Sequence, residues 1–360
     1  MAQQVTVLGG AGLAHDAGLP LSTGLADNLK EELANLVAAQ DVAPLEHENA
    51  MVFLATLRFL EGAVRFQEGV LNRDPGRTIN IEQLAVSAIQ LRDRLTNPLA
   101  PYISGWHQRI VELERLKPSV LNDFIEFIFS QLEKWLTTSD KNAVAYLARL
   151  GDLRLKDVGL DIFSLNYDLC LEQALQNLGK HKLRNGFTED GWRPGEFEDD
   201  QEAIRLFKLH GSLDWIEDEL YGLCSLEFPR HRNAEDISGE HRPLLIFGTS
   251  NKLSARQPFL TLAHHFSEQI LSTDVLVVVG YSFGDDYVNE IIKQGIDANG
   301  KLRILVVEPT ASRLVTTQAI LNGNPRVTTL DMTAKIALNE GQVLDAVQKL
   351  LTESGEEKPF

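Results

Sequence analysis

The strongest constraint on the fold is a series of short apolar runs, each ending in a turn, that alternates with amphipathic segments. The apolar runs lie at residues 159–165, 204–211, 244–250, 274–280 and 301–309, with others at 5–10 and near Val327. Runs of this length, apolar on both faces, are typical of buried strands. Helical apolar spacing follows at residues 167–179, 286–300, 312–321 and 334–351. Such alternation predicts an α/β fold with a doubly wound, mostly parallel, Rossmann-like sheet.

A second pattern occupies residues 25–150, where apolar residues recur every three or four positions and prolines interrupt them. This spacing predicts a large all-helical insertion between the first two strands. We therefore expect residues 1–24 and 151–332 to form a nucleotide-binding Rossmann core. Residues 25–150 would form the insertion, and 333–360 a C-terminal helix with a polar tail.

Charge and cysteine content narrow the class of protein. The formal net charge is −17, with no dense Lys/Arg cluster, which argues against direct nucleic-acid binding. Cys170 and Cys224 fit no zinc-ligand spacing, and two isolated cysteines suit a reducing compartment. No apolar stretch reaches the ~20 residues of a membrane helix. We expect a cytoplasmic protein that needs no zinc and binds no membrane.

Glycines follow the first apolar run, in the segment from Gly10 through Ala11 and Gly12 to Gly18. Glycines at a strand-to-helix turn allow the backbone to approach a pyrophosphate. The usual dinucleotide fingerprint is incomplete because His15 stands where its third glycine belongs. A simple tight turn explains this segment equally well.

Two further strand ends carry polar side chains. Asn166 and Asp168 follow one apolar run, and His210 lies at the end of the next. Ligands of open α/β sheets bind beyond the carboxyl ends of strands, and histidine is a common general base. The alternatives are that Asn166 and Asp168 cap a helix, and that His210 is a hydrogen-bonded core residue.

The segment from Gly280 to Gly284 matches the G-x-S-x-G elbow of serine hydrolases. That family places its acid and histidine after the serine, whereas the last histidine here, His265, precedes Ser282. Ser282 is therefore interpreted as a phosphate or ribose ligand. Glu308, at the end of a later run, could accept hydrogen bonds from a ribose.

Taken in order, these motifs resemble the sirtuin family over the first ~20 residues and from about 159 to 309. The segment that begins at Gly10 resembles the G-A-G segment that opens sirtuins, and Ser164–Asp168 is similar to the family's T-Q-N-x-D motif. His210–Gly211 matches the family's His-Gly pair, and Gly280–Ser282 is similar to its G-T-S motif. Glu308 falls where the family often has a ribose-binding Asn.

Departures from that family are equally informative. Leu21-Ser22-Thr23 stands where deacetylases carry Asp-Phe-Arg, Ala14 replaces a serine, and the four zinc cysteines are missing. The pattern is closer to the sirtuin-like NAD hydrolases of bacterial anti-phage defence, which carry N-Y-D, K-L-H-G and a helical insertion. The resemblance implies control through homo-oligomerisation or a separate partner, such as a HerA-type ATPase.

The resemblance also implies roles for these residues with NAD as the substrate. Asn166 and His210 would be catalytic, and Asp168 would recognise the nicotinamide amide. The pyrophosphate and adenosine ribose would be held by Gly10, Ala11, Gly12, Gly280, Ser282 and Glu308. Three functions remain open: NAD glycohydrolase, NAD-dependent protein deacylase, and non-catalytic NAD or ADP-ribose sensor within a complex.

Overall fold

The computed structural model describes most of the chain in two compact units. One unit comprises residues 1–19 and 136–360, and the other residues 20–135. No helix among the described residues is long and apolar enough to cross a bilayer. The described residues are 3–72, 74, 76, 78–93, 107–138, 140–156, 158–179, 181–198, 200, 202–218, 221–228, 242–247 and 257–356.

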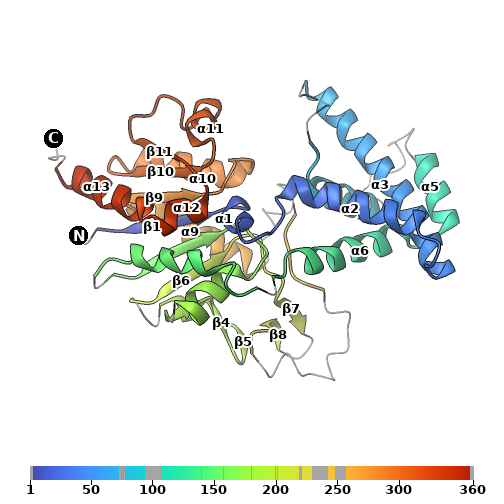
Figure 1. Ribbon diagram of the computed structural model, residues 1–360, viewed down its shortest axis with the longest axis horizontal. Coiled ribbons are helices and arrows are strands. Elements are labelled where there is room, and N and C mark those ends of the chain that lie inside the picture. The colour runs from blue at the N-terminus through green and yellow to red at the C-terminus, as the bar shows by residue number, and fades with distance from the viewer. Residues whose placement is uncertain are drawn as a thin grey trace. The chain divides into compact units, whose positions relative to one another are not determined.

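The larger unit is built on a seven-stranded sheet (Figure 1) with the order β11-β10-β9-β1-β2-β6-β3. Every neighbouring pair in it is parallel. This topology confirms the predicted doubly wound, parallel Rossmann-like sheet. The strands are β1 (Val5–Gly9), β2 (Leu160–Ser164), β3 (Leu183–Arg184), β6 (Ile204–Lys208), β9 (Val275–Val279), β10 (Arg303–Glu308) and β11 (Val327–Asp331).

Helices cover both faces of this sheet because alternate side chains of each strand point to opposite sides. One face packs against α9 (Phe259–Ser272), α10 (Asp286–Ala298) and α11 (Ala311–Thr317) in a continuous apolar core. The helices α12 (Ala334–Asn339) and α13 (Gln342–Glu356) contact β10. The same layer holds α1 (Gly12–His15), η3 (Ala145–Leu153), α7 (Cys170–Glu172) and η4 (Gln173–Leu178).

Short elements connect β2 to α9. Two hairpins pair β4 (Phe187–Thr188) with β5 (Gly191–Trp192), and β7 (Trp215–Asp218) with β8 (Gly222–Ser225). A 3-10 turn, η5 (Pro194–Phe197), follows β5. Its Phe197 ring stacks on Phe207 of β6, with ring centroids 4.2 Å apart, and so ties the loops to the main core.

Two predicted elements differ in the structure. The prediction of a strand at residues 244–250 is wrong within the described residues 244–247. Only Leu245 among them forms a bridge, an isolated antiparallel one to Gly211. That segment is apolar because Ile246 and Phe247 are buried, although it has no continuous strand partner. The helix expected at 334–351 is two helices, since Gly341 adopts a positive φ of 74° between them.

Every regular element among the described residues of the smaller unit is a helix, as its apolar spacing predicts. Pro44 occupies the first turn of its longest helix, where a missing N–H costs nothing. Asn80 and Gln83 form a reciprocal capping box. The helices are α2 (Ser22–Ala38), α3 (Pro44–Val70), α4 (Ile81–Arg92), α5 (His107–Leu116) and α6 (Val120–Trp135).

The turns after β1 and β9 pack backbone against backbone. A Cβ on Gly10 would lie 2.7 Å from the Gly280 carbonyl oxygen, and one on Gly12 would lie 2.8 Å from the Gly280 Cα. Gly280 itself has a φ of 63°. These three glycines therefore meet a steric requirement of the protein interior, in addition to any contact with a ligand.

We predict that Gly280→Ala lowers the free energy of unfolding by at least about 2 kcal/mol, because it combines left-handed backbone with a steric clash. The added Cβ would lie 2.2 Å from the Leu13 backbone nitrogen. Urea denaturation measures the change. Gly300→Ala is the control, since a Cβ there meets no heavy atom within 4 Å. Equal stability of the two variants would contradict the prediction.

Candidate functional site

The register of the sheet brings the polar strand ends together. Ser164 of β2 pairs with Gly9 of β1 and with Lys208 of β6. Asn166 lies two residues beyond Ser164, and His210 lies two residues beyond Lys208, the matched partner of Ser164 on the neighbouring strand. Neighbouring strands of a sheet lie about 4.8 Å apart. The structure places these two predicted catalytic residues at the same edge of the sheet.

The connections of β1 and β9 define a particular point at this edge. The chain leaves β1 through α1, in the layer of α12, and leaves β9 through α10, in the opposite layer. Neighbouring parallel strands whose connections go to opposite faces define a topological switch point, where open α/β sheets bind their ligands. The predicted glycine turns flank this point.

The backbone amides in these turns are unequally available. The Gly10 N–H donates to the Val279 carbonyl at 3.0 Å, and the Gly12 N–H donates to the Gly280 carbonyl at 2.8 Å. Neither the Ala11 nor the Ser282 N–H donates to an acceptor among the described residues. An anion bound at these turns would consequently find its donors at Ala11 and Ser282, both exposed, rather than at Gly10 and Gly12.

Asn166 and Asp168 are both buried, at 8% and 5% exposure. The N-cap of α7 is Leu169, so Asn166 does not cap that helix. Asp168 does support the local turn, since its Oδ1 accepts a hydrogen bond from the Cys170 N–H at 3.0 Å. The capping alternative therefore fails for Asn166, whereas Asp168 has a structural role through one of its two carboxylate oxygens.

His210 is buried and bonded on one side only. Its Nε2 lies 3.0 Å from Oδ2 of Asp285, while Nδ1 is buried without any hydrogen-bond partner among the described residues. Burial and one hydrogen bond fit a core histidine. A second ring nitrogen left unpaired does not, because buried polar atoms are normally satisfied.

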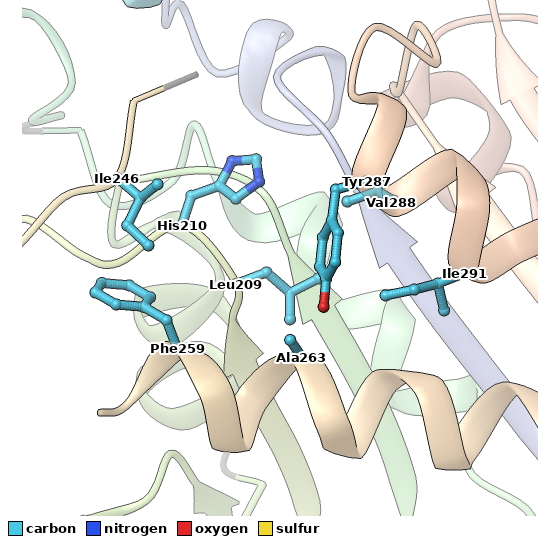
Figure 2. A pocket seen from close by; sticks show the side chains of 8 residues that line it. All are labelled: Leu209, His210, Ile246, Phe259, Ala263, Tyr287, Val288 and Ile291. Atoms are coloured by element: carbon cyan, nitrogen blue, oxygen red, sulfur yellow. The ribbon is translucent and has the colours of Figure 1, made fainter. Parts of the chain in front are cut away.

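A small apolar pocket adjoins this histidine. Figure 2 shows the imidazole at its rim, with one ring nitrogen directed toward α10. The pocket wall is otherwise apolar or aromatic, and is formed by Leu209, Ile246, Phe259, Ala263, Tyr287, Val288 and Ile291. Such surroundings exclude water, which strengthens electrostatic interactions at the histidine.

Asp285 was not among the residues predicted for the site. It is 6% exposed and is the N-cap of α10, where its Oδ1 accepts from the N–H groups of Tyr287 at 3.0 Å and Val288 at 3.4 Å. The Tyr281 hydroxyl hydrogen-bonds with its backbone. The sequence signal is an Asp immediately before an amphipathic helix, which indicates a cap but says nothing of His210.

A buried lysine lies beneath the Asn166–Asp168 turn. The Lys208 ammonium, in a side chain 2% exposed, donates to the Asp168 backbone carbonyl and lies 3.3 Å from Oε1 of Glu172. Burial raises the pKa of Glu172 to about 7, an effect that the Lys208 charge opposes. The only sequence signal for this pair is a lysine inside an apolar run.

The remaining predicted residues lie at the same edge with more exposure. Ser282 is exposed, and it makes no hydrogen bond to His210, whose free nitrogen has no partner among the described residues. A Ser–His hydrolase pair is therefore not formed. Oε2 of Glu308 accepts bonds from the N–H and hydroxyl of Thr310 at 2.8 and 3.0 Å.

Metal ligation needs several acidic, histidine or cysteine side chains in one cluster. Over the described parts of the chain, no group of three or more His, Cys, Asp or Glu side chains is arranged to hold a metal ion. The two cysteines, Cys170 and Cys224, are buried and unbridged. Burial also raises the pKa of the Cys170 thiol, so it remains protonated at neutral pH.

Comparison with known proteins links this edge to one domain type. Residues 161–321 match the profile of the SIR2-like domain, a segment that begins in β2 and includes Asn166, His210 and Ser282. The glycine turn after β1 lies outside the match. The chain thus combines a Rossmann-like fold with a segment similar to the SIR2-like domain. No curated protein sequence matches it.

Solved structures show a weak overall likeness. A SIR2 homologue in complex with NAD is 15% identical, with 97% of this chain and 90% of that chain covered and a TM-score of 0.44. A Sir2 protein in complex with the inhibitor EX-527, 2'-O-acetyl-ADP-ribose and a deacetylated p53 peptide is 11% identical, with coverages of 96% and 94% and a TM-score of 0.44.

We predict that Glu172 makes stability depend on pH. Its pKa is about 7 in the folded protein against 4.5 ordinarily, so the folded state holds an extra proton between these values. The resulting stabilisation is complete below about pH 4.5 and is lost as pH rises to about 7. Glu172→Gln, which cannot titrate, should lack this loss.

Thermal melting of wild type and Glu172→Gln between about pH 5 and pH 8 measures this difference. The wild-type melting temperature should fall relative to the variant as pH rises. Glu353→Gln, at an exposed position of α13, serves as control for the charge change. A wild-type-to-variant difference that is constant across this pH range would refute the assignment.

Proposed function

We propose that this chain is an NAD glycohydrolase that cleaves NAD to nicotinamide and ADP-ribose. The observation that carries the proposal is the position of Asn166 and His210 at one sheet edge, each two residues beyond the matched pair Ser164 and Lys208, with the buried Nδ1 of His210 left unpaired. The match of residues 161–321 to the SIR2-like domain supports NAD as the ligand of this edge.

Cleavage breaks the bond between the nicotinamide nitrogen and C1 of the ribose. Nicotinamide leaves with the electron pair, and positive charge develops on the ribose before a water oxygen bonds to C1. Asn166 would orient the ribose hydroxyls or that water, and His210 would take a proton through Nδ1. General-base catalysis contributes about 10²–10⁴ in rate.

The binding groups follow from the hydrogen bonds that remain available. Asp168 would receive the nicotinamide amide through Oδ2, since its Oδ1 already accepts from Cys170. The backbone amide of Ala11 and the amide and hydroxyl of Ser282, supported by the Gly10, Gly12 and Gly280 turns, would hold the pyrophosphate. Glu308 would bind the adenosine ribose through Oε1, because Oε2 is engaged by Thr310.

The biological role is proposed on resemblance alone. Sirtuin-like NAD hydrolases of anti-phage defence deplete NAD, and an enzyme of this activity needs restraint in its own cell. Homo-oligomerisation or a HerA-type ATPase partner would supply that restraint. A deacylase would instead require an acylated peptide for nicotinamide release, and a sensor would bind NAD without turnover.

We predict that Asn166→Ala and His210→Ala each reduce nicotinamide release by about 10²-fold or more. Asn166→Ala should melt close to wild type, whereas His210→Ala should melt somewhat lower but remain folded, because the buried Asp285 loses a hydrogen-bond partner. Both side chains follow strand ends and take no part in the strand ladders. Purified protein is mixed with NAD, and nicotinamide and ADP-ribose are quantified by chromatography. Asn322→Ala and His264→Ala, at exposed positions, are the matched controls.

Wild-type turnover in a well-folded Asn166→Ala or His210→Ala protein would remove that residue from the mechanism. Loss of activity accompanied by equal loss of stability would favour a purely structural role. Nicotinamide release that depends on an acylated peptide would replace the hydrolase proposal by the deacylase alternative. NAD binding without cleavage would leave the sensor.

Ser282→Ala should raise the KM for NAD about 10-fold while turnover persists at saturation, the loss expected for one hydrogen bond to a charged group. The exposed Ser282 should not react with a fluorophosphonate probe, because it has no bond to His210 that could activate it. Ser272→Ala, on the exposed end of α9, is the control. Labelling at Ser282 would revive the serine-hydrolase interpretation.

A further inference from the structure

We infer that Asp285 is a positioning residue that fixes the proton of His210 on Nε2 and so leaves Nδ1 as the proton acceptor. This inference deepens the proposed function and names a residue that the glycine, Asn and His motifs do not contain. It rests on the 3.0 Å contact between His210 Nε2 and Asp285 Oδ2, both in side chains that are about 6–7% exposed.

The two carboxylate oxygens of Asp285 have separate partners. Oδ1 accepts from the first N–H groups of α10, those of Tyr287 and Val288. Oδ2 is therefore held toward His210 by the helix itself. An ionised carboxylate has no hydrogen to give, so the bond to Nε2 requires a proton on that nitrogen.

The consequence for His210 follows from imidazole chemistry. A neutral imidazole that carries its proton on Nε2 presents a lone pair at Nδ1. Nδ1 is the ring nitrogen that has no partner within the described structure. Once Nδ1 has taken a proton, the ring is cationic and Asp285 stabilises it, as a carboxylate does for the histidine of a catalytic triad.

The substitution Asp285→Asn tests this directly. Its amide oxygen would stay on the N–H groups of Tyr287 and Val288, because only an oxygen can accept from them. The NH₂ group would then occupy the Oδ2 position and donate to His210 Nε2, forcing the proton to Nδ1. Asn is as good an N-cap as Asp, so α10 keeps its start.

Long-range ¹H–¹⁵N NMR of the full chain reads the tautomer, with the His210 signals identified by their loss in His210→Gln. We expect the Nε2–H form in wild type and the Nδ1–H form in Asp285→Asn. Nicotinamide release should fall at least about 10²-fold in that variant, with an unchanged melting temperature. Asp286→Asn, the same charge change one residue later at an exposed position, should alter neither property.

An Nδ1–H tautomer in the wild-type protein would overturn the inference, as would an Asp285→Asn variant with unchanged tautomer and turnover. Asp285→Ser separates capping from positioning, because Ser caps a helix without a carboxylate. It should remain folded, with a lower melting temperature because the buried His210 Nε2 loses its partner, while losing activity. If wild-type protein does not cleave NAD, the proposed function fails, while the tautomers of wild type and Asp285→Asn still decide the role of Asp285.

Discussion

The parallel register of β1, β2, β6 and β9 is the constraint on which the site depends. Because Gly9, Ser164, Lys208 and Val279 lie at one level across these strands, every residue that follows them emerges at the same edge. A slip of one residue in β6 would turn the side chains of this strand to the opposite faces of the sheet and displace His210 from Asp285. The apolar core on both faces of the sheet holds this register, so the chemistry of the edge depends on packing far from it.

Burial sets the chemical character of the edge. Lys208 ties Glu172 to the backbone of Asp168, and Asp285 ties His210 to the start of α10. Charges taken out of water are stabilising only when their partners are well placed, and a lone buried partner is costly. Both pairs therefore restrict the conformations of the turns that carry Asn166 and His210, which favours a preorganised site.

The sequence predicted the sheet and its edge well for physical reasons. Fully buried parallel strands must be apolar on both faces, so the runs that form β2, β6, β9 and β10 are conspicuous in the sequence. The carboxyl ends of parallel strands all lie at one edge of the sheet. The positions of Asn166 and His210, each just after a strand, therefore suffice to predict that both lie at that edge. The strand that the apolar run predicts is wrong at the described residues 244–247 for a related reason, since Ile246 and Phe247 are buried without belonging to a continuous strand.

Side-chain partnerships could not be predicted in the same way. Asp285 is distant from His210 in sequence, and its cap position explains its identity without reference to a histidine. Lys208 and Glu172 form a pair only because the fold brings α7 close to the end of β6, and no local pattern encodes that contact. The Gly10–Gly18 segment predicts either a phosphate-binding turn or a simple tight turn, and the structure adds a steric reason for glycine, because a Cβ on Gly12 would lie 2.8 Å from the Gly280 Cα.

The order of strands also has a consequence for how the chain reaches its folded state. The central strand β1 pairs with β2 and with β9, and Val5 is matched to Val275. The whole helical unit and most of the larger unit are synthesised after β1 and before β9. Non-local pairing of this kind gives a high contact order and slow folding. During synthesis, β1 therefore lacks one of its two neighbouring strands until β9 has been made.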